Sequence, residues 1–206
     1  MLRHGETDWN AAHRWQGWID IPLNDKGRQQ AGQRATQLRD DGARFAAIAS
    51  SDLARATETA AILAEVLAID LHIQHAGFRE RFGGDWQGLT HDEINRAFPE
   101  ALQQWRAGIL AGPPNAENLE AMVARFDAAL VELHGKAPDG PVLLVSHGGI
   151  QRAIAVRAGI DLDGVHDNLS GLWLSYDGSD LRAATNEETP IELDDATTHS
   201  RQFSAE

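Results

Sequence analysis

The chain has 206 residues, enough for one large α/β domain with a substantial hydrophobic core. It contains no cysteine, which excludes disulfides, cysteine metal sites and thiol nucleophiles. The formal net charge of -13 argues against nucleic acid and anionic membranes as partners, and no apolar run is long enough to span a bilayer. We therefore expect a cytoplasmic protein that binds a small molecule, and an anionic ligand would need its few arginines gathered in one place.

The first ten residues place an arginine and a histidine directly after a strand end. Met1-Leu2-Arg3 is shorter than the usual core strand of about five or six residues, so we expect either a short strand or a start upstream. Residues 6–22 have no helical period and are rich in Trp, Asn and Gly, which predicts a long structured loop. Its tryptophans, Trp9, Trp15 and Trp18, could wall a pocket, cover the core or serve a homodimer.

Beyond this loop, segments with a helical period alternate with short apolar segments. Asn24 is a good N-cap for the first helix, and Ser51 or Asp52 is the expected cap of the second. The predicted helices cover about residues 24–42, 52–67, 90–96, 100–106, 119–133 and 150–158. The predicted strands cover about residues 45–49, 70–74, 142–145, 172–176 and 181–183.

This alternation predicts a three-layer α/β/α architecture with a mostly parallel central sheet. We expect a single domain over residues 1–186, with the two helices of residues 90–106 lying over the sheet. Residues 187–206 are polar and acidic without periodicity, which predicts a poorly ordered tail.

Several polar side chains follow the predicted strands: Arg3, His4, Arg55, Glu80 and His147. Because ligands of parallel sheets bind at the carboxyl ends of the strands, we expect these side chains to share one rim. Arg55 falls in the first turn of a helix, where a cation opposes the helix dipole, so a bound anion would explain its presence. Taken alone, Arg55 would be better explained as a solvated side chain that pairs with Asp52 or Glu58 at the surface.

An ordered series of short motifs runs through the chain to about residue 175. The members are Arg3-His4-Gly5-Glu6-Thr7 with Trp9-Asn10, Gln16-Gly17-Trp18, Ser50-Ser51-Asp52-Leu53 with Arg55-Ala56, Arg79-Glu80, Gly84-Asp85-Trp86-Gln87-Gly88-Leu89 and Val145-Ser146-His147-Gly148-Gly149. This series resembles the histidine phosphatase superfamily, also called the phosphoglycerate mutase-like family. Each motif alone is weakly specific, but their order together is highly specific.

The resemblance implies that His4 is the nucleophile that becomes phosphorylated. Arg3, Arg55 and His147 would hold the phosphoryl group, and Glu80 would be the proton donor. Further residues implied to lie near the substrate are Asn10, Gln16, Gly17 and Gly148. The sequence departs from the family pattern in three places: the first strand has no apolar lead-in, Phe78 stands where an aliphatic residue is usual, and Asn115-Ala116-Glu117-Asn118 replaces Gly-Gly-Glu-Ser.

The chemistry of these residue types agrees with the resemblance. A neutral imidazole is a competent nucleophile near pH 7 if its other nitrogen is held by an acceptor. Two arginines offer bidentate donors to phosphoryl oxygens, and His147 would add a third cation if protonated. Since these groups can replace a metal ion, we expect no cofactor.

Within the family, the short segment between Glu80 and Gly84 resembles the phosphatase branch rather than the mutases. We therefore predict a phosphomonoesterase that releases inorganic phosphate from a small phosphorylated metabolite, such as a sugar or glycerate phosphate. Two alternatives stay open: a cofactor-dependent phosphoglycerate mutase, and a phosphate-binding module without chemistry.

Overall fold

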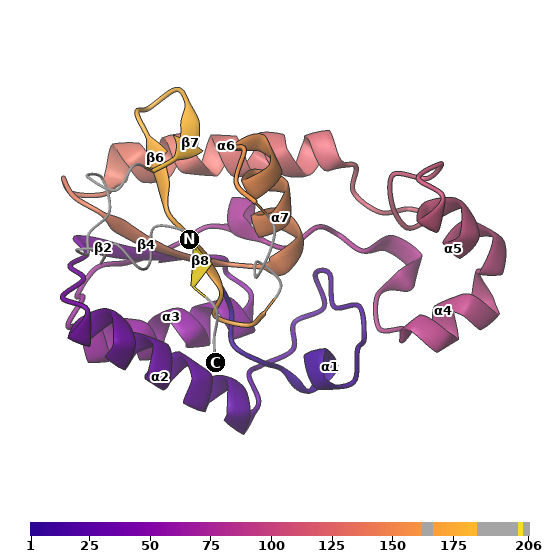
Figure 1. The fold of residues 1–206 in the computed structure, drawn as a ribbon, viewed down its shortest axis with the longest axis horizontal. Coiled ribbons are helices and arrows are strands. Elements are labelled where there is room, and N and C mark those ends of the chain that lie inside the picture. The colour runs from indigo at the N-terminus through magenta and orange to yellow at the C-terminus, as the bar shows by residue number, and fades with distance from the viewer. Residues whose placement is uncertain (162–166, 185–201, 204–206) are drawn as a thin grey trace.

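The computed structural model describes residues 1–161, 167–184 and 202–203, and its central feature is a twisted sheet between two layers of helices (Figure 1). In spatial order, the strands of this sheet within the described residues are β3 (His72–Gln74), β2 (Ala47–Ser50), β4 (Val142–Ser146), β1 (Leu2–Arg3), β5 (Gly171–Leu172) and β8 (Gln202–Phe203). The four strands from β3 to β1 pair in parallel, whereas β5 and β8 pair antiparallel. The predicted three-layer architecture with a mostly parallel sheet is confirmed.

Each face of the sheet is covered by a pair of helices (Figure 1). One face carries α2 (Asp25–Asp40) and α3 (Ala54–Leu67), and the other carries α6 (Leu119–Lys136) and α7 (Gly148–Arg157). The core is divided accordingly, because a parallel sheet covered on both sides buries apolar side chains on both faces. Buried residues of the first layer are Ala35, Leu38, Ala56, Ala60 and Leu63. Buried residues of the second layer are Met122, Phe126, Ala129, Leu133, Ile150 and Ile154.

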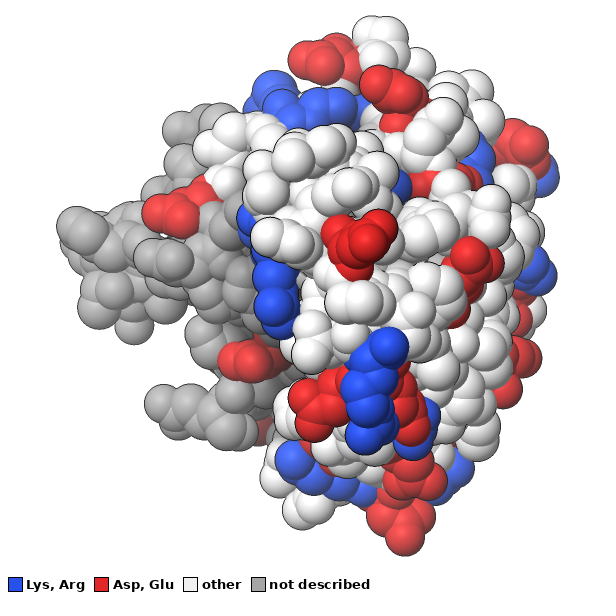
Figure 2. Space-filling view, turned by 90° about the vertical axis from the view of Figure 1, so that its right-hand side faces the viewer, with Lys and Arg blue, Asp and Glu red and all other residues white. Residues whose placement is uncertain are grey.

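The helices α4 (His91–Ala97) and α5 (Pro99–Arg106) project beyond the sheet, at the right of Figure 1. They have a small core of their own, in which Trp86, Ile94 and Leu102 are buried. On the side of the molecule that Figure 2 presents, acidic and basic residues are interspersed and much of the surface is uncharged. No helix in the described part of the chain is long and apolar enough to cross a membrane.

Helix ends were the least accurate part of the predictions. The segment predicted as a loop contains α1 (Asp8–Ala11), which a capping box between Thr7 and Asn10 stabilises. The N-cap of α3 is Leu53 rather than Ser51 or Asp52, and it makes no side-chain capping bond. By contrast, Asn24 caps α2 as predicted, with its side chain accepting a hydrogen bond from the Gly27 N–H.

The carboxyl-terminal part differs from the prediction in its strands. The predicted strand over residues 172–176 is divided between two sheets, because β5 ends at Leu172 and β6 (Leu174–Tyr176) forms a hairpin with β7 (Leu181–Ala183). In the predicted tail, residues 202–203 pair with β5 as strand β8. Residues 187–201 and 204–206 lie outside the described residues. Single turns of 3-10 helix, Ala76–Phe78 and Gly84–Trp86, flank the segment that carries Glu80.

Candidate active site

The pairing of β1 with β4 brings the two histidines together. Their parallel register aligns Arg3 with Ser146, so the next residue of each strand, His4 and His147, emerges at the same edge of the sheet. The backbone N–H of His4 donates to the Ser146 carbonyl at 3.0 Å. The ring centroids of His4 and His147 are 5.2 Å apart, in an edge-to-face arrangement. Two residues far apart in the sequence are thus in contact at the edge of the sheet.

Hydrogen bonding fixes the tautomer of His4. Its Nδ1 lies 2.7 Å from the carbonyl oxygen of Gly5, and because a carbonyl can only accept, Nδ1 carries the proton. The other nitrogen, Nε2, therefore has a free lone pair when the ring is neutral. Burial, together with Arg55 and Arg3, lowers the pKa of His4 well below its ordinary value. The ring is consequently neutral near pH 7, as a nucleophile requires.

His147 is fully buried, and neither of its ring nitrogens has a hydrogen-bond partner within the described part of the chain. Burial, and then the neighbouring Arg55 and His4, lower its pKa well below the ordinary value. The protein as described thus holds His147 neutral rather than as a third cation. A dianion placed against the ring would raise this pKa again, because an opposite charge favours the protonated form.

Arg55 is also fully buried, and it does not make the surface ion pair that was the alternative. Its Nη1 donates to the Ile19 carbonyl at 2.9 Å and its Nη2 to the Gly17 carbonyl at 2.7 Å. Burial lowers its pKa to about 10, so the guanidinium remains charged at neutral pH. Burial likewise lowers the pKa of Arg3, which lines the same cavity.

The carboxylate of Glu80 is directed away from the arginines beside it in the sequence. Its Oε2 accepts from the Gly149 N–H at 2.9 Å, and its Oε1 accepts from the backbone N–H of Arg81 at 2.7 Å. Arg79 instead forms a bidentate pair with Asp52, with N···O distances of 2.7 and 2.6 Å. The Glu80 carboxylate therefore contacts the first turn of α7, which begins directly after His147 at the end of β4.

The predicted residues converge on one cavity of about 840 Å³. The predicted site residues that line it are Arg3, His4, Asn10, Gln16, Gly17, Arg55 and Glu80. His147 and Gly148 lie behind this surface: His147 contacts His4, and a side chain at Gly148 would meet Arg3 at 3.3 Å. The other lining residues include the apolar Trp15, Trp105, Pro113, Leu119 and Met122 and the cationic Arg14, Arg81 and Arg152.

The tryptophans of the first loop have different roles. Trp15 lines the cavity and packs edge-to-face against Trp86 and Trp105. Trp18 does not line it; its indole N–H donates to the Glu80 carbonyl at 2.6 Å.

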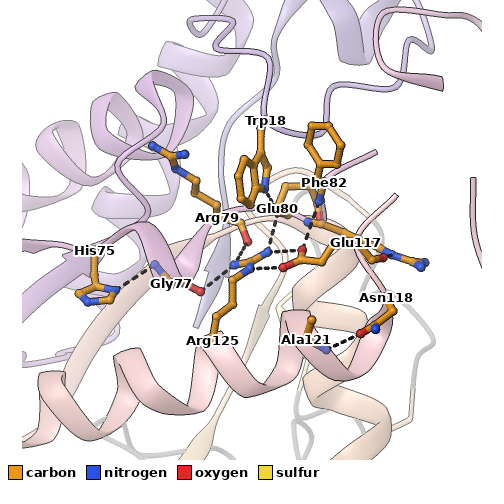
Figure 3. Close-up of polar contacts among 11 residues, drawn as sticks. Trp18, His75, Gly77, Arg79, Glu80, Phe82, Glu117, Asn118, Ala121 and Arg125 are labelled. Carbon is orange, nitrogen blue, oxygen red and sulfur yellow. Dashed lines mark hydrogen bonds and ion pairs between the residues drawn. The ribbon is translucent and has the colours of Figure 1, made fainter. Parts of the chain in front are cut away.

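The unusual Asn115-Ala116-Glu117-Asn118 segment has structural roles. Asn115 has a φ of 57°, a left-handed conformation that asparagine tolerates better than most other residues, and here it replaces the family's glycine. Asn118 replaces the serine and caps α6, accepting from the Ala121 N–H at 2.6 Å (Figure 3). The carboxylate of Glu117 pairs with Arg125 at 2.7 Å.

Sequence reasoning missed Arg125, which contacts the segment carrying Glu80 (Figure 3). It also missed two supports of His4: Thr59, whose hydroxyl accepts from the Gly5 N–H at 3.0 Å, and Asn168, whose side chain donates to the His4 carbonyl at 2.8 Å. The only available signal for Arg125 was a cation within the strongly apolar stripe of α6.

Known proteins resemble this chain in sequence and in fold. The family model described as "Histidine phosphatase superfamily (branch 1)" matches residues 1–187. A glucosyl-3-phosphoglycerate phosphatase from Mycobacterium tuberculosis is 38% identical over 164 residues, which cover 75% of this chain and 72% of that protein. Phosphoglycerate mutase-like protein 4 from Arabidopsis thaliana is 36% identical over 160 residues, which cover 77% and 69%, respectively.

Among solved structures, a mycobacterial glucosyl-3-phosphoglycerate phosphatase in complex with VO3 superposes with a TM-score of 0.71. The two chains are 33% identical, and the match covers 88% of this chain and 93% of that one. Family model, sequence relatives and fold thus agree with one another and with the motifs. The chain belongs to the histidine phosphatase superfamily.

Proposed function

We propose that this protein hydrolyses phosphomonoesters of small metabolites through a phosphohistidine on His4. One observation supports this above the others: the Gly5 carbonyl fixes the His4 proton on Nδ1, so that Nε2 presents its lone pair in the site that also holds Arg3 and the buried Arg55. A phosphohydrolase activity agrees with the family and with the phosphatases among its relatives. The formal net charge of -13 favours a small-molecule ester over nucleic acid, and we propose a cytoplasmic location.

In the first step, Nε2 of His4 attacks phosphorus, the N–P bond forms and the ester P–O bond breaks. The departing oxygen takes a proton from the Glu80 carboxyl group and leaves as an alcohol. Arg3 and Arg55 offer donors to the phosphoryl oxygens, and His147 supplies a further donor once the bound anion favours its protonation. Positioning and charge stabilisation are the main requirements of phosphoryl transfer.

In the second step, water attacks the phosphohistidine and the N–P bond breaks. The Glu80 carboxylate accepts a proton from this water, so inorganic phosphate leaves, His4 returns to its neutral state and Glu80 is protonated again. Protons and charges therefore balance over the cycle. The arginines take the part that a metal ion has in many phosphatases, so a chelator should leave activity intact.

The cavity supports a substrate larger than phosphate itself. Its apolar lining residues and the cations Arg81 and Arg152 suit a phosphorylated sugar or glycerate. The relative from Mycobacterium tuberculosis carries glucosyl-3-phosphoglycerate in its name, which makes that compound the first member of a substrate panel. Sugar phosphates, phosphoglycerates and nitrophenyl phosphate complete the panel.

The test measures phosphate release across this panel and acid-labile label on the protein. Label should be found on His4 in the native protein, and His4→Ala should lose both label and turnover. Label on another residue, or turnover by the Ala variant, would contradict the proposal. Phosphoglycerate mutases also occur among the relatives, so interconversion of 2- and 3-phosphoglycerate is measured in parallel. Interconversion faster than phosphate release would identify a mutase instead.

A further inference from the structure

We propose that Arg125 is a positioning residue for Glu80: from α6, it fixes the backbone from which the proton-donating carboxyl group reaches the substrate. This inference rests on the proposed function, because it assigns Arg125 a purpose only if Glu80 transfers protons. Arg125 itself is not among the residues that line the cavity. It therefore acts through Glu80 and not on the substrate.

The guanidinium of Arg125 uses all five of its N–H donors, three on carbonyls of the segment around Glu80 and two on the Glu117 carboxylate (Figure 3). Nη1 donates to the carbonyls of Gly77 and Arg79, both at 2.8 Å. Nη2 donates to the Glu80 carbonyl at 2.7 Å and to Glu117 Oε2 at 2.9 Å, and Nε donates to Glu117 Oε1 at 2.7 Å. Three carbonyls of one short segment thus share a single rigid, planar donor.

The Glu80 carbonyl is held from a second side by Trp18. The indole N–H donates to this oxygen at 2.6 Å, and the indole ring lies 5.7 Å from the Arg125 Cζ and 5.2 Å from the Arg79 Cζ. Figure 3 shows the ring above the Arg125 guanidinium, with the Arg79 side chain beside it. An arginine and a tryptophan from different parts of the chain therefore converge on the main chain of one residue.

Glu117 completes the support on the other side of Glu80. Its carboxylate accepts from the Phe82 N–H at 3.3 Å, its own N–H donates to the Phe82 carbonyl at 3.1 Å, and its carbonyl accepts from Arg81 Nε at 2.7 Å. The side chains of Arg125 and Glu117 are only 19% and 13% exposed. A largely buried pair with every donor satisfied holds its geometry more firmly than an ion pair at the surface.

Arg125 is itself held in place, because its helix α6 is packed against the sheet. Met122 and Phe126, which flank Arg125 on the helix, are buried in the core. Phe126 packs against Phe78, two residues before Glu80, with ring centroids 5.6 Å apart. From the segment held in this way, the Glu80 side chain extends to the Gly149 N–H. A shift of the segment would therefore displace the carboxyl group relative to His4.

The experiment uses the full chain and follows single-turnover phosphorylation of His4 with two substrates. Glycerol phosphate needs a proton on its leaving oxygen, whereas the phenolate of nitrophenyl phosphate departs without one. Arg125→Met keeps the side-chain stem and removes the donors. Arg157→Met is the matched control, because Arg157 also makes a two-contact pair, with Asp127 at 2.8 and 2.7 Å, at the far end of α7.

We expect Arg125→Met to slow phosphorylation by glycerol phosphate at least about 10-fold more than phosphorylation by nitrophenyl phosphate, as loss of a general acid's alignment requires. Arg157→Met should leave both rates unchanged. In a Glu80→Gln background, Arg125→Met should cause no additional loss of the glycerol phosphate rate. The Arg125→Lys variant, which keeps the charge but has a single nitrogen, should show the same selectivity if Arg125→Met fails to fold.

Equal losses with both substrates would overturn the inference, as would a further loss in the Glu80→Gln background, since either would show a merely structural role. These outcomes leave the proposed function intact, because the native protein would still form phosphohistidine. Absence of phosphohistidine in the native protein would overturn the proposed function, and the assignment of Arg125 with it.

Discussion

Replacing Gly149 by alanine tests the placement of the Glu80 carboxylate directly. Gly149 is the second residue of α7, and its N–H holds Glu80 Oε2 at 2.9 Å. A Cβ at this position would lie 3.1 Å from Glu80 Cδ and closer still to Glu80 Oε1. The second distance is shorter than the 3.0 Å below which Cβ contacts are essentially never observed. The helix itself accepts alanine, so the contact with Glu80 is the whole of the perturbation.

A carboxylate forced back from this position loses its alignment with the leaving oxygen. A displacement of about 1 Å can cost about 10²-fold in rate, and a general acid contributes typically 10²–10⁴-fold. We therefore expect Gly149→Ala to slow phosphorylation of His4 by glycerol phosphate about 100-fold, with a much smaller effect for nitrophenyl phosphate. Rapid-quench single-turnover measurement gives both rates.

The matched control is Gly135→Ala in α6, where an added Cβ would meet nothing within 4 Å. This substitution should raise the free energy of unfolding by about 1 kcal/mol and leave both rates unchanged. If Gly149→Ala matched the native rate with glycerol phosphate, or lost rate equally with both substrates, Glu80 could not be the proton donor in the position described.

Three further changes test the remainder of the site. Gly17 has a φ of 53°, and a Cβ there would collide with Gln87. Gly17→Ala should therefore lower the melting temperature and weaken inhibition by phosphate. Unchanged values of both would show that the loop adapts to the added methyl group. In Arg55→Lys the charge is kept, but a lysine cannot donate to both the Gly17 and Ile19 carbonyls. Calorimetry should therefore show phosphate binding at least about 10-fold more weakly. Unaltered affinity would contradict a phosphate-binding role for Arg55. Burial lowers the pKa of His4 and His147, so at acidic pH the unfolded chain binds protons that the native protein does not. The free energy of unfolding should therefore fall as the pH drops below about 6.5, by up to about 1.4 kcal/mol per pH unit for each histidine. His147→Asn should flatten that slope in urea titrations between pH 7 and 5.5, and parallel curves for the two proteins would refute the assignment.

The strand ends were predictable because they depend on local pattern and on a general rule of parallel sheets. An apolar run followed by Ser146-His147-Gly148 identifies the end of a buried strand, and the rule then places His147 on the same rim as His4. The motif resemblance added roles to these positions. Neither source needed knowledge of the order of the strands.

The missed features depend on contacts that local pattern does not encode. The capping box of α1 uses Asn10 where glutamate or glutamine is usual, so Thr7 gave no clear helix signal. The division of the predicted strand at residues 172–176 follows from pairing with two different partners. Arg125 is the clearest case, because its five donors are used by residues 8 to 48 positions away in the chain. Only the tertiary arrangement shows what this cation is for.

The central position of β4 has a consequence for the order of events in folding. β4 lies between β1 and β2, and the register joins Leu2 to Val145, so the four parallel strands cannot be joined until nearly three quarters of the chain is available. Closing so long a loop makes this pairing one of the slower steps. During synthesis, His4 emerges first but meets His147 only in this late step. Phosphatase activity should therefore appear only once β1 has paired with β4, which makes turnover a direct reporter of this folding step.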